Sequence, residues 1–187
     1  MLKTLAIAIL VIMPVAVFGQ EQMTSARFHE IVSTPGDSTP LNPKLAAAIG
    51  VLFTNATVKI TVKYPDGKAV KFDVAETAKT VAGKYIVTTV RSQSNNEQTI
   101  DSIMTFDDKA SVYKGWATYG DKIIGGVSVY DFDKKIVSTF VDYGDGSSEL
   151  TVGSYTGSES SDRTVILKNG VLFCTRESKT TPANLLK

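Results

Sequence analysis

The sequence of 187 residues is poor in the residue types that build most catalytic and metal sites. It has one cysteine, Cys174, and one histidine, His29. A single cysteine excludes an internal disulfide, and a single histidine excludes a metal site made of a histidine cluster. We interpret Cys174, beside Phe173 in an apolar stretch, as a buried small hydrophobe. We interpret His29 as a solvated side chain, with a general base as the alternative.

The sequence also lacks the short motifs that identify common enzymes. It contains no G-x-S-x-G elbow, no H-E-x-x-H, no P-loop and no G-x-G-x-x-G. A loose resemblance of residues 142–146 to a calcium loop lacks the EF-hand spacing and its terminal glutamate. We therefore predict no metal and no cofactor. Acidic pairs do occur, but at predicted turns, where aspartate hydrogen-bonds the backbone: Asp107 with Asp108, Asp131 with Asp133, and Asp142 with Asp145.

An excess of charge of either sign is missing as well. The chain has 20 Lys and Arg against 19 Asp and Glu, for a net charge of +1. Lys3 is the only charged residue in the first 19, so the net charge of the remainder is zero. A balanced surface gives no broad electrostatic attraction to nucleic acid or to an anionic membrane. We expect neither as a partner.

The N-terminus has the pattern of a signal peptide. Lys3 precedes an apolar stretch from Leu5 to Val17, and Gly19 ends the segment. The pattern predicts cleavage after residue 19 and export to the periplasm or the extracellular space, with no membrane attachment afterwards. The alternative is an uncleaved anchor, which the short apolar run disfavours, because it falls below about 18 residues.

Residues 20–187 are of a length that suits a single domain. Residues 20–40 are polar and predict a flexible arm with one short helical turn around 25–32. Residues 41–50 predict a short helix, with Asn42 as its cap, Pro43 at its first position and Gly50 as its stop. Such a helix either plugs one end of a barrel or lies on the surface, and the sequence leaves both open.

Residues 51–178 have the period-two pattern of β-strands. Val58, Ile60 and Val62 alternate with polar residues, and tight turns such as Asn169-Gly170 recur along the chain. Nine or ten short strands joined by tight turns must pair antiparallel, as an up-and-down meander. Closure into a barrel removes the sheet edges. A two-sheet sandwich is the competing all-β fold, and the barrel is favoured because no long crossover follows Ser92.

Two hairpins in this region resemble each other and a known family. Phe106-Asp107-Asp108-Lys109 precedes Tyr113 and Trp116, and Tyr130-Asp131-Phe132-Asp133 precedes Phe140 at the same spacing. The stretch from Met104 to Trp116 resembles the YDP-x-x-x-x-Y-x-x-W hairpin of bacterial calycin-like domains of unknown function. The similarity spans residues 84–177, and Asp108 stands where that pattern often has proline. It implies a lipocalin-shaped, often exported barrel and, more loosely, a pocket, but no catalytic residues.

Four residues of the two hairpins are candidates for ligand contact: Tyr113, Lys114, Trp116 and Phe140. Tyr113 and Trp116 lie on opposite faces of one strand, so one of them faces inward. An inward Trp116 would carry Lys114 with it and indicate an anionic head-group site, whereas an outward Trp116 would leave Lys114 solvated. The recurring small residues either leave space in the lumen or mark strand bends: Gly115, Ala117, Gly125, Gly126 and Gly153.

Three functional hypotheses follow. The first is an exported, non-enzymatic β-barrel that binds a small, largely apolar molecule. The second is a structural or protein-interaction module with a filled barrel and an active arm at 20–40. The third is a hydrolase or isomerase that uses turn carboxylates, with or without His29. It requires two carboxyl groups to converge in a concave site with raised pKa values.

Overall fold

The computed structural model describes residues 23–49, 55–93, 98–156 and 158–183. The predicted signal peptide at 1–19 and the first residues of the predicted arm lie outside these ranges. Within them, neither helix is long and apolar enough to cross a membrane.

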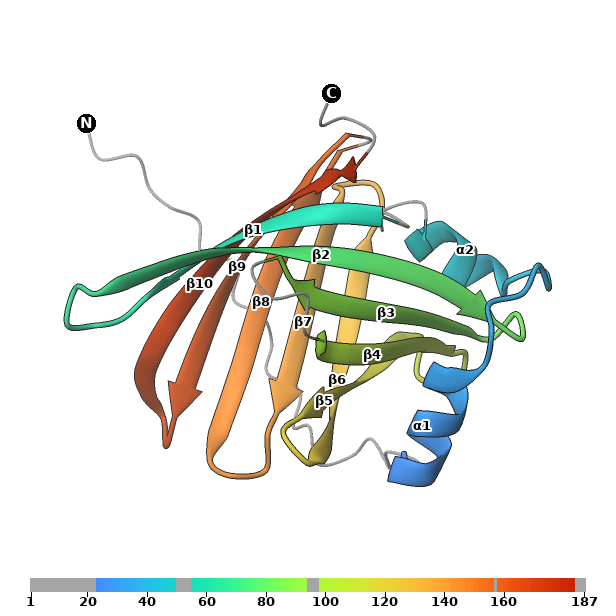
Figure 1. Ribbon diagram of the computed structural model, residues 1–187, viewed down its shortest axis with the longest axis horizontal. Helices are drawn as coiled ribbons and strands as arrows, with labels where there is room; N and C mark the ends of the chain where they lie inside the picture. The colour runs from blue at the N-terminus through green and yellow to red at the C-terminus, as the bar shows by residue number, and fades with distance from the viewer. Residues whose placement is uncertain (1–22, 50–54, 94–97, 157, 184–187) are drawn as a thin grey trace.

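The fold is a closed barrel of ten antiparallel strands in the order β1-β10-β9-β8-β7-β6-β5-β4-β3-β2 (Figure 1). Each strand pairs with its neighbours in the sequence, so the chain is an up-and-down meander. This confirms the predicted all-β barrel over the two-sheet sandwich. Two helices precede the strands, where the sequence predicts one short helix and a helical turn. The strands are β1 (Asn55–Lys63), β2 (Ala69–Val81), β3 (Tyr85–Ser92), β4 (Gln98–Asp107), β5 (Val112–Tyr119), β6 (Lys122–Asp131), β7 (Ile136–Asp142), β8 (Ser147–Tyr155), β9 (Ser160–Lys168) and β10 (Val171–Pro182).

The strand register separates the side chains that face the lumen from those that face outward. Side chains alternate along a strand, and directly paired residues share a face. Tyr113 of β5 therefore shares its face with Phe106 of β4 and Ser128 of β6. The same rule carried around the barrel brings Glu76, Tyr130 and Asp162 into the lumen from β2, β6 and β9.

Helix α2 (Pro43–Ile49) plugs one end of this lumen. The Asn42 side chain accepts a hydrogen bond from the Lys44 backbone N–H at 2.9 Å, as predicted for the cap. Leu45 and Ala48 are buried against the inward-facing Ile86 and Tyr113. The Tyr113 hydroxyl donates a 2.9 Å hydrogen bond to the Lys44 carbonyl. The helix is thus a plug and not a surface helix.

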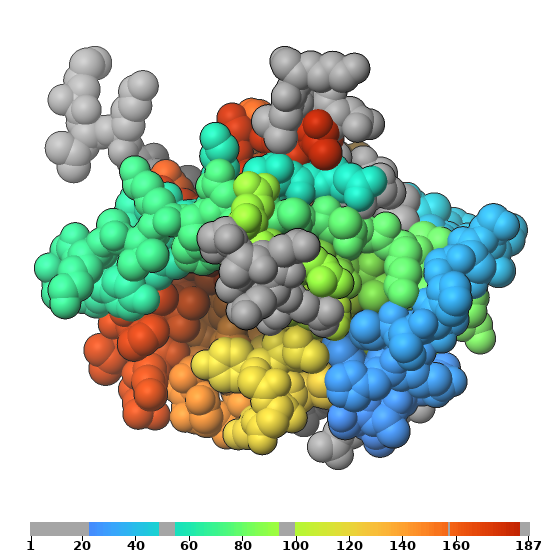
Figure 2. Space-filling model, viewed as in Figure 1, coloured from blue at the N-terminus to red at the C-terminus, as the bar shows by residue number. Residues whose placement is uncertain are grey.

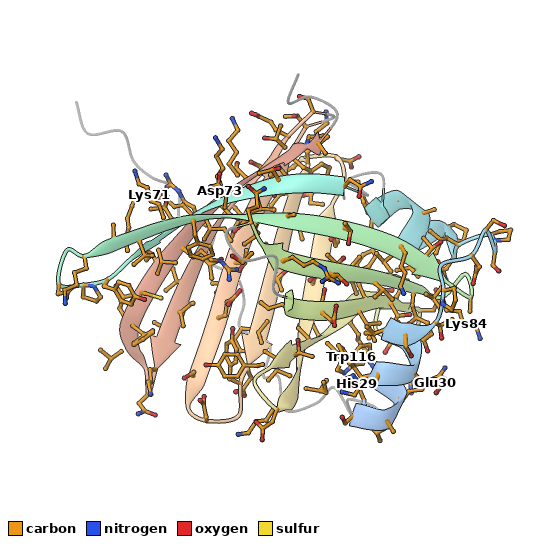
Figure 3. All side chains as sticks on the ribbon, viewed as in Figure 1. His29, Glu30, Lys71, Asp73, Lys84 and Trp116 are labelled. Atoms are coloured by element: carbon orange, nitrogen blue, oxygen red, sulfur yellow. The ribbon has the colours of Figure 1, made fainter. Side chains whose placement is uncertain are left out.

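Helix α1 (Ser25–Ser33) lies within the segment that the sequence predicts as a flexible arm. The structure differs from that expectation, because Phe28 and Ile31 are buried against the outer face of the barrel. Their neighbours there are Val87, Ile103 and Trp116. In Figure 3 the labelled Trp116 lies beside α1, and Figure 2 shows both helices at one end of the molecule and the β1–β2 hairpin at the other.

If α1 is an integral part of the fold, removing its buried ring destabilises the whole protein. We expect Phe28→Ala to lower the free energy of unfolding by about 3–5 kcal/mol, because it empties a fully buried site. Ala26→Ser, at an exposed position of the same helix, should change it by less than about 0.5 kcal/mol. Urea denaturation measures both. Equal stability of Phe28→Ala and the wild type would mean that α1 is a detachable arm.

Candidate functional site

A cavity of about 230 Å³ lies inside the lumen, below the α2 plug, and we call it the chamber. Its wall combines two carboxyl groups, two tyrosines and several hydroxyl groups, and its residues come from six strands, β2 and β6–β10. The lining residues are Glu76, Tyr130, Val137, Thr139, Thr151, Gly153, Ser154, Tyr155, Ser160, Ser161, Asp162 and Thr180. A volume near the lower end of small-molecule sites suits a small ligand.

Glu76 and Asp162 face the chamber from β2 and β9 and interact electrostatically. Burial of the Glu76 carboxyl disfavours its ionised form, and the negative charge of Asp162 adds to this, so that the pKa of Glu76 rises to about 7. Burial likewise raises the pKa of Tyr130. The chamber is therefore a site where the protonation of a carboxyl group changes near neutral pH.

Two polar atoms at the chamber are buried without a hydrogen-bond partner: the Tyr155 hydroxyl and Asp162 Oδ1. The other carboxylate oxygen of Asp162 accepts a short hydrogen bond from the Ser178 hydroxyl. Most buried polar atoms in proteins are paired, since an unpaired one costs about 1–3 kcal/mol. Both atoms are thus free to bond a molecule that enters the chamber.

A second polar layer lies between the chamber and the opposite end of the barrel. Arg176 donates hydrogen bonds to Glu149 at 3.0 Å and to the Thr164 hydroxyl at 3.1 Å. The other oxygen of Glu149 accepts a hydrogen bond from the Tyr143 hydroxyl at 2.9 Å. These groups satisfy one another's hydrogen-bonding capacity, so Arg176 already has partners. Arg176 is also not among the lining residues of the chamber.

The lumen end opposite α2 is lined by apolar side chains that remain exposed. Val70, Phe72, Ile100 and Tyr119 share the inward face of their strands, yet each is more than 40% exposed. Inward-facing side chains in a filled barrel would be covered. This end is therefore an apolar mouth, in contrast to the polar chamber.

A larger groove of about 550 Å³ lies on the outer surface of β1 and β7–β10. Three of its charged side chains are in ion pairs: Arg163 with Glu177 at 3.7 Å, and Lys179 with Glu159 at 2.7 Å. Among the described residues that line this groove, the one unpartnered buried atom is Asp162 Oδ1, and Asp162 also lines the chamber. The chamber is the better candidate site despite its smaller volume.

The four residues predicted from the sequence do not lie together. Tyr113 faces the lumen and anchors α2, whereas Trp116 faces outward against α1. Lys114 also faces outward, but it is not solvated as expected for that case. Its ammonium group lies 2.6 Å from the Asp107 carboxylate, and its side chain is 14% exposed. Phe140 faces outward between Val127 and Leu150.

The small residues include examples of both predicted roles, space in the lumen and local strand geometry. Gly115, Ala117, Gly126 and Gly153 face the lumen, and Gly125 faces outward. A Cβ atom at Gly126 would lie 2.8 Å from the Phe140 carbonyl oxygen, so this glycine permits close strand approach. A Cβ atom at Gly115 would meet only the Ile103 carbonyl oxygen, at 3.7 Å, so this glycine leaves space.

Among the turn carboxylates, Asp107, Asp131, Asp142 and Asp145 have structural partners. Asp107 and Asp131 accept hydrogen bonds from backbone N–H groups of their own turns. A hydrogen bond and ion pair with Lys114 lowers the pKa of Asp107, and the Lys134 backbone N–H lowers that of Asp131. These directions are opposite to the raised pKa values that the hydrolase hypothesis requires. Where described, the chain has no group of three or more potential metal ligands.

The carboxyl pair of the chamber was missed by the sequence reasoning. Glu76 lies in the polar stretch A-E-T-A-K, and Asp162 in S-S-D-R, so both resemble ordinary exposed strand positions. The available signal was the alternation of side chains along a strand. By that alternation, Glu76 shares a face with Val74 and Phe72. His29 is exposed and Cys174 is buried, as predicted.

The shape of the barrel is similar to those of solved structures. One is Rv2717c from M. tuberculosis, with a TM-score of 0.52 and 10% identity, over 76% of this chain and 98% of the other. Another is the S-type phycobiliprotein lyase CPES from Guillardia theta, with a TM-score of 0.52 and 10% identity, over 73% of this chain and 90% of the other. No protein-family model matches the chain, and no curated protein matches it. At this identity the similarity concerns the fold, a ten-stranded antiparallel barrel compatible with the calycin-like resemblance.

Gly115 and Gly126 should respond differently to an added methyl group. Gly126→Ala should destabilise the protein by about 1–3 kcal/mol, because its Cβ would press against backbone. Gly115→Ala should be neutral or stabilising by up to about 1 kcal/mol, since its Cβ has room. Thermal or urea unfolding of the pair checks this. A larger loss of unfolding free energy for Gly115→Ala than for Gly126→Ala would contradict the conclusion that Gly115 leaves space and Gly126 permits close strand approach.

The raised pKa of Glu76 should make stability depend on pH. The unfolded chain releases this proton near pH 4.5, whereas the folded chain holds it to about pH 7. The contribution of protonated Glu76 to the free energy of unfolding is therefore fully present below about pH 4.5 and is lost as the pH rises through about 7. Glu76→Gln should remove this loss. Relative to the wild type, the variant should gain about 2–3 kcal/mol between pH 4.5 and pH 8.

Urea unfolding of both proteins across this range gives the measurement. Asp73→Asn, at an exposed position on the outer side of the same strand, is the matched control (Figure 3). A constant difference between Glu76→Gln and the wild type at all pH values would mean that Glu76 ionises normally.

Proposed function

We propose that this protein is an exported, non-enzymatic barrel that binds a small molecule in the lumen chamber. The observation that carries the proposal is the pair of buried atoms without a partner, the Tyr155 hydroxyl and Asp162 Oδ1. A bound molecule would satisfy both. The fold alone is compatible with many functions, so it does not specify a ligand.

The mouth and the chamber together favour an amphipathic ligand. The sequence predicts a largely apolar molecule, and the exposed apolar side chains of the mouth, such as Phe72 and Tyr119, support an apolar portion. The chamber lining supports a polar group deeper in the lumen, because the Tyr155 hydroxyl and Asp162 Oδ1 have no hydrogen-bond partner. A wholly apolar molecule would leave these groups unpaired.

The filled-barrel alternative has less support. It requires a lumen without space and an arm that is available to a partner protein. The chamber volume and the room for a Cβ atom at Gly115 oppose the first requirement. The burial of Phe28 and Ile31 against the barrel opposes the second. Phe140 and Leu150 do belong to an outward-facing apolar row, but no contact marks that row as a docking surface.

Native mass spectrometry of protein from the exported fraction of its own host tests the proposal. We expect a mature chain that begins at Gln20 and carries a stoichiometric adduct that denaturation removes. Val137→Phe, which adds bulk inside the chamber, should lose the adduct. Val152→Phe, at an exposed outward position of β8, should keep it.

Urea unfolding must first show that both phenylalanine variants fold. An adduct retained equally by the two folded variants would place the ligand outside the chamber. A clean mass for the wild type, with no stabilisation by any small molecule in a thermal-shift screen, would count against a binding function and favour the filled barrel.

A further inference from the structure

The chamber has an excess of negative groups. Glu76 and Asp162 both line it, and no lysine or arginine is among its lining residues. None of the ion pairs within the described residues includes either carboxyl group. Arg176, in the next layer, is held by Glu149 and Thr164. Ionised carboxyl groups buried without a cation are costly, so the chamber lacks a positive partner.

The position that lacks a positive partner is Asp162 Oδ1. Ser178 occupies one oxygen of Asp162, while Oδ1 is buried, unbonded and part of the chamber wall. A donor placed there would also reach a wall rich in further acceptors, because the hydroxyls of Thr139, Thr151 and Thr180 line the same space. An anion at this position would meet like charge, and a neutral molecule would leave the carboxylate uncompensated.

The other walls suit an organic cation more than a metal ion. The rings of Tyr130 and Tyr155 line the chamber, and aromatic rings attract ammonium groups. A metal ion would need a denser set of ligands, and the described residues hold no cluster of three or more candidate side chains. Two carboxyl groups with two tyrosines match the recognition of an ammonium group.

We propose that the chamber binds the ammonium group of a small organic cation between Glu76, Asp162 and the two tyrosine rings. This inference rests on the proposed function, since it names the ligand class for the same chamber. Without the cation, Glu76 retains its proton up to about pH 7 and so limits the negative charge. The titratable groups that face Glu76 are Asp162, Tyr130 and Tyr155. Cation binding should therefore displace the Glu76 proton.

Calorimetric titration with choline and tetramethylammonium tests the inference, because neither probe changes its charge with pH. The control ligand is 3,3-dimethylbutan-1-ol, which has the shape of choline without its charge. At pH 8 we expect at least one cation to bind, and the neutral alcohol to bind at least 10-fold more weakly than choline. The affinity for the cation should fall as the pH drops below about 7, where Glu76 is protonated.

Variants locate the site. Asp162→Asn and Glu76→Gln should each weaken cation binding at pH 8 by at least 10-fold. Asp73→Asn removes an exposed carboxylate from the outer side of β2 and should leave it unchanged. Urea unfolding confirms that each variant is folded. Equal binding of choline and its neutral analogue, no effect of Asp162→Asn, or no binding of either cation would overturn the inference.

The two proposals fail in different ways. If mass spectrometry finds a neutral or anionic ligand that Val137→Phe excludes, the cation inference is wrong and the binding function stands. If the cations bind equally well to Val137→Phe, the ammonium site is not the chamber, and the inference is again wrong.

Discussion

The pairing of the first strand with the last is the interaction on which the rest of the structure depends. Eight consecutive residue pairs, from Ala56 with Pro182 to Lys63 with Thr175, join β1 to β10. Glu76 lies on β2 and Asp162 on β9, so these two strands bring the carboxyl groups to one cavity only through that pairing. Without it, β1 and β10 would be open sheet edges and the chamber would have no wall.

Apolar packing and buried polar groups occupy different levels along the barrel axis. The helix end holds the tightly packed apolar clusters, with Phe28 outside the wall and Leu45 inside it. The middle of the lumen holds polar groups, and the opposite end holds exposed apolar side chains such as Phe72. Burial of apolar surface at one end can therefore offset the cost of buried polar groups in the middle. Binding sites commonly occur where such polar groups lack full satisfaction.

The aromatic cluster below α2 connects these two regions. Tyr113 contacts Phe106 and Tyr130, with ring centroids 4.9 and 4.6 Å apart, and its hydroxyl bonds the α2 backbone. Tyr130 in turn lines the chamber. The plug helix thus fixes the position of a chamber wall, although none of residues 43–48 lines the chamber. A change in the α2 contacts would reach the site through Tyr113 and Tyr130.

The strands and turns were predictable because their signals are local. Alternation from Val58 to Val62, the Asn169-Gly170 turn and the Asn42-Pro43 helix start each need only neighbouring residues. Only the tertiary structure decided which face of a central strand points inward. In β5 both faces carry aromatic rings, since α1 covers Trp116 on one side and α2 covers Tyr113 on the other. The convergence of Glu76 and Asp162 likewise depended on barrel closure, which joins residues 86 positions apart in the sequence.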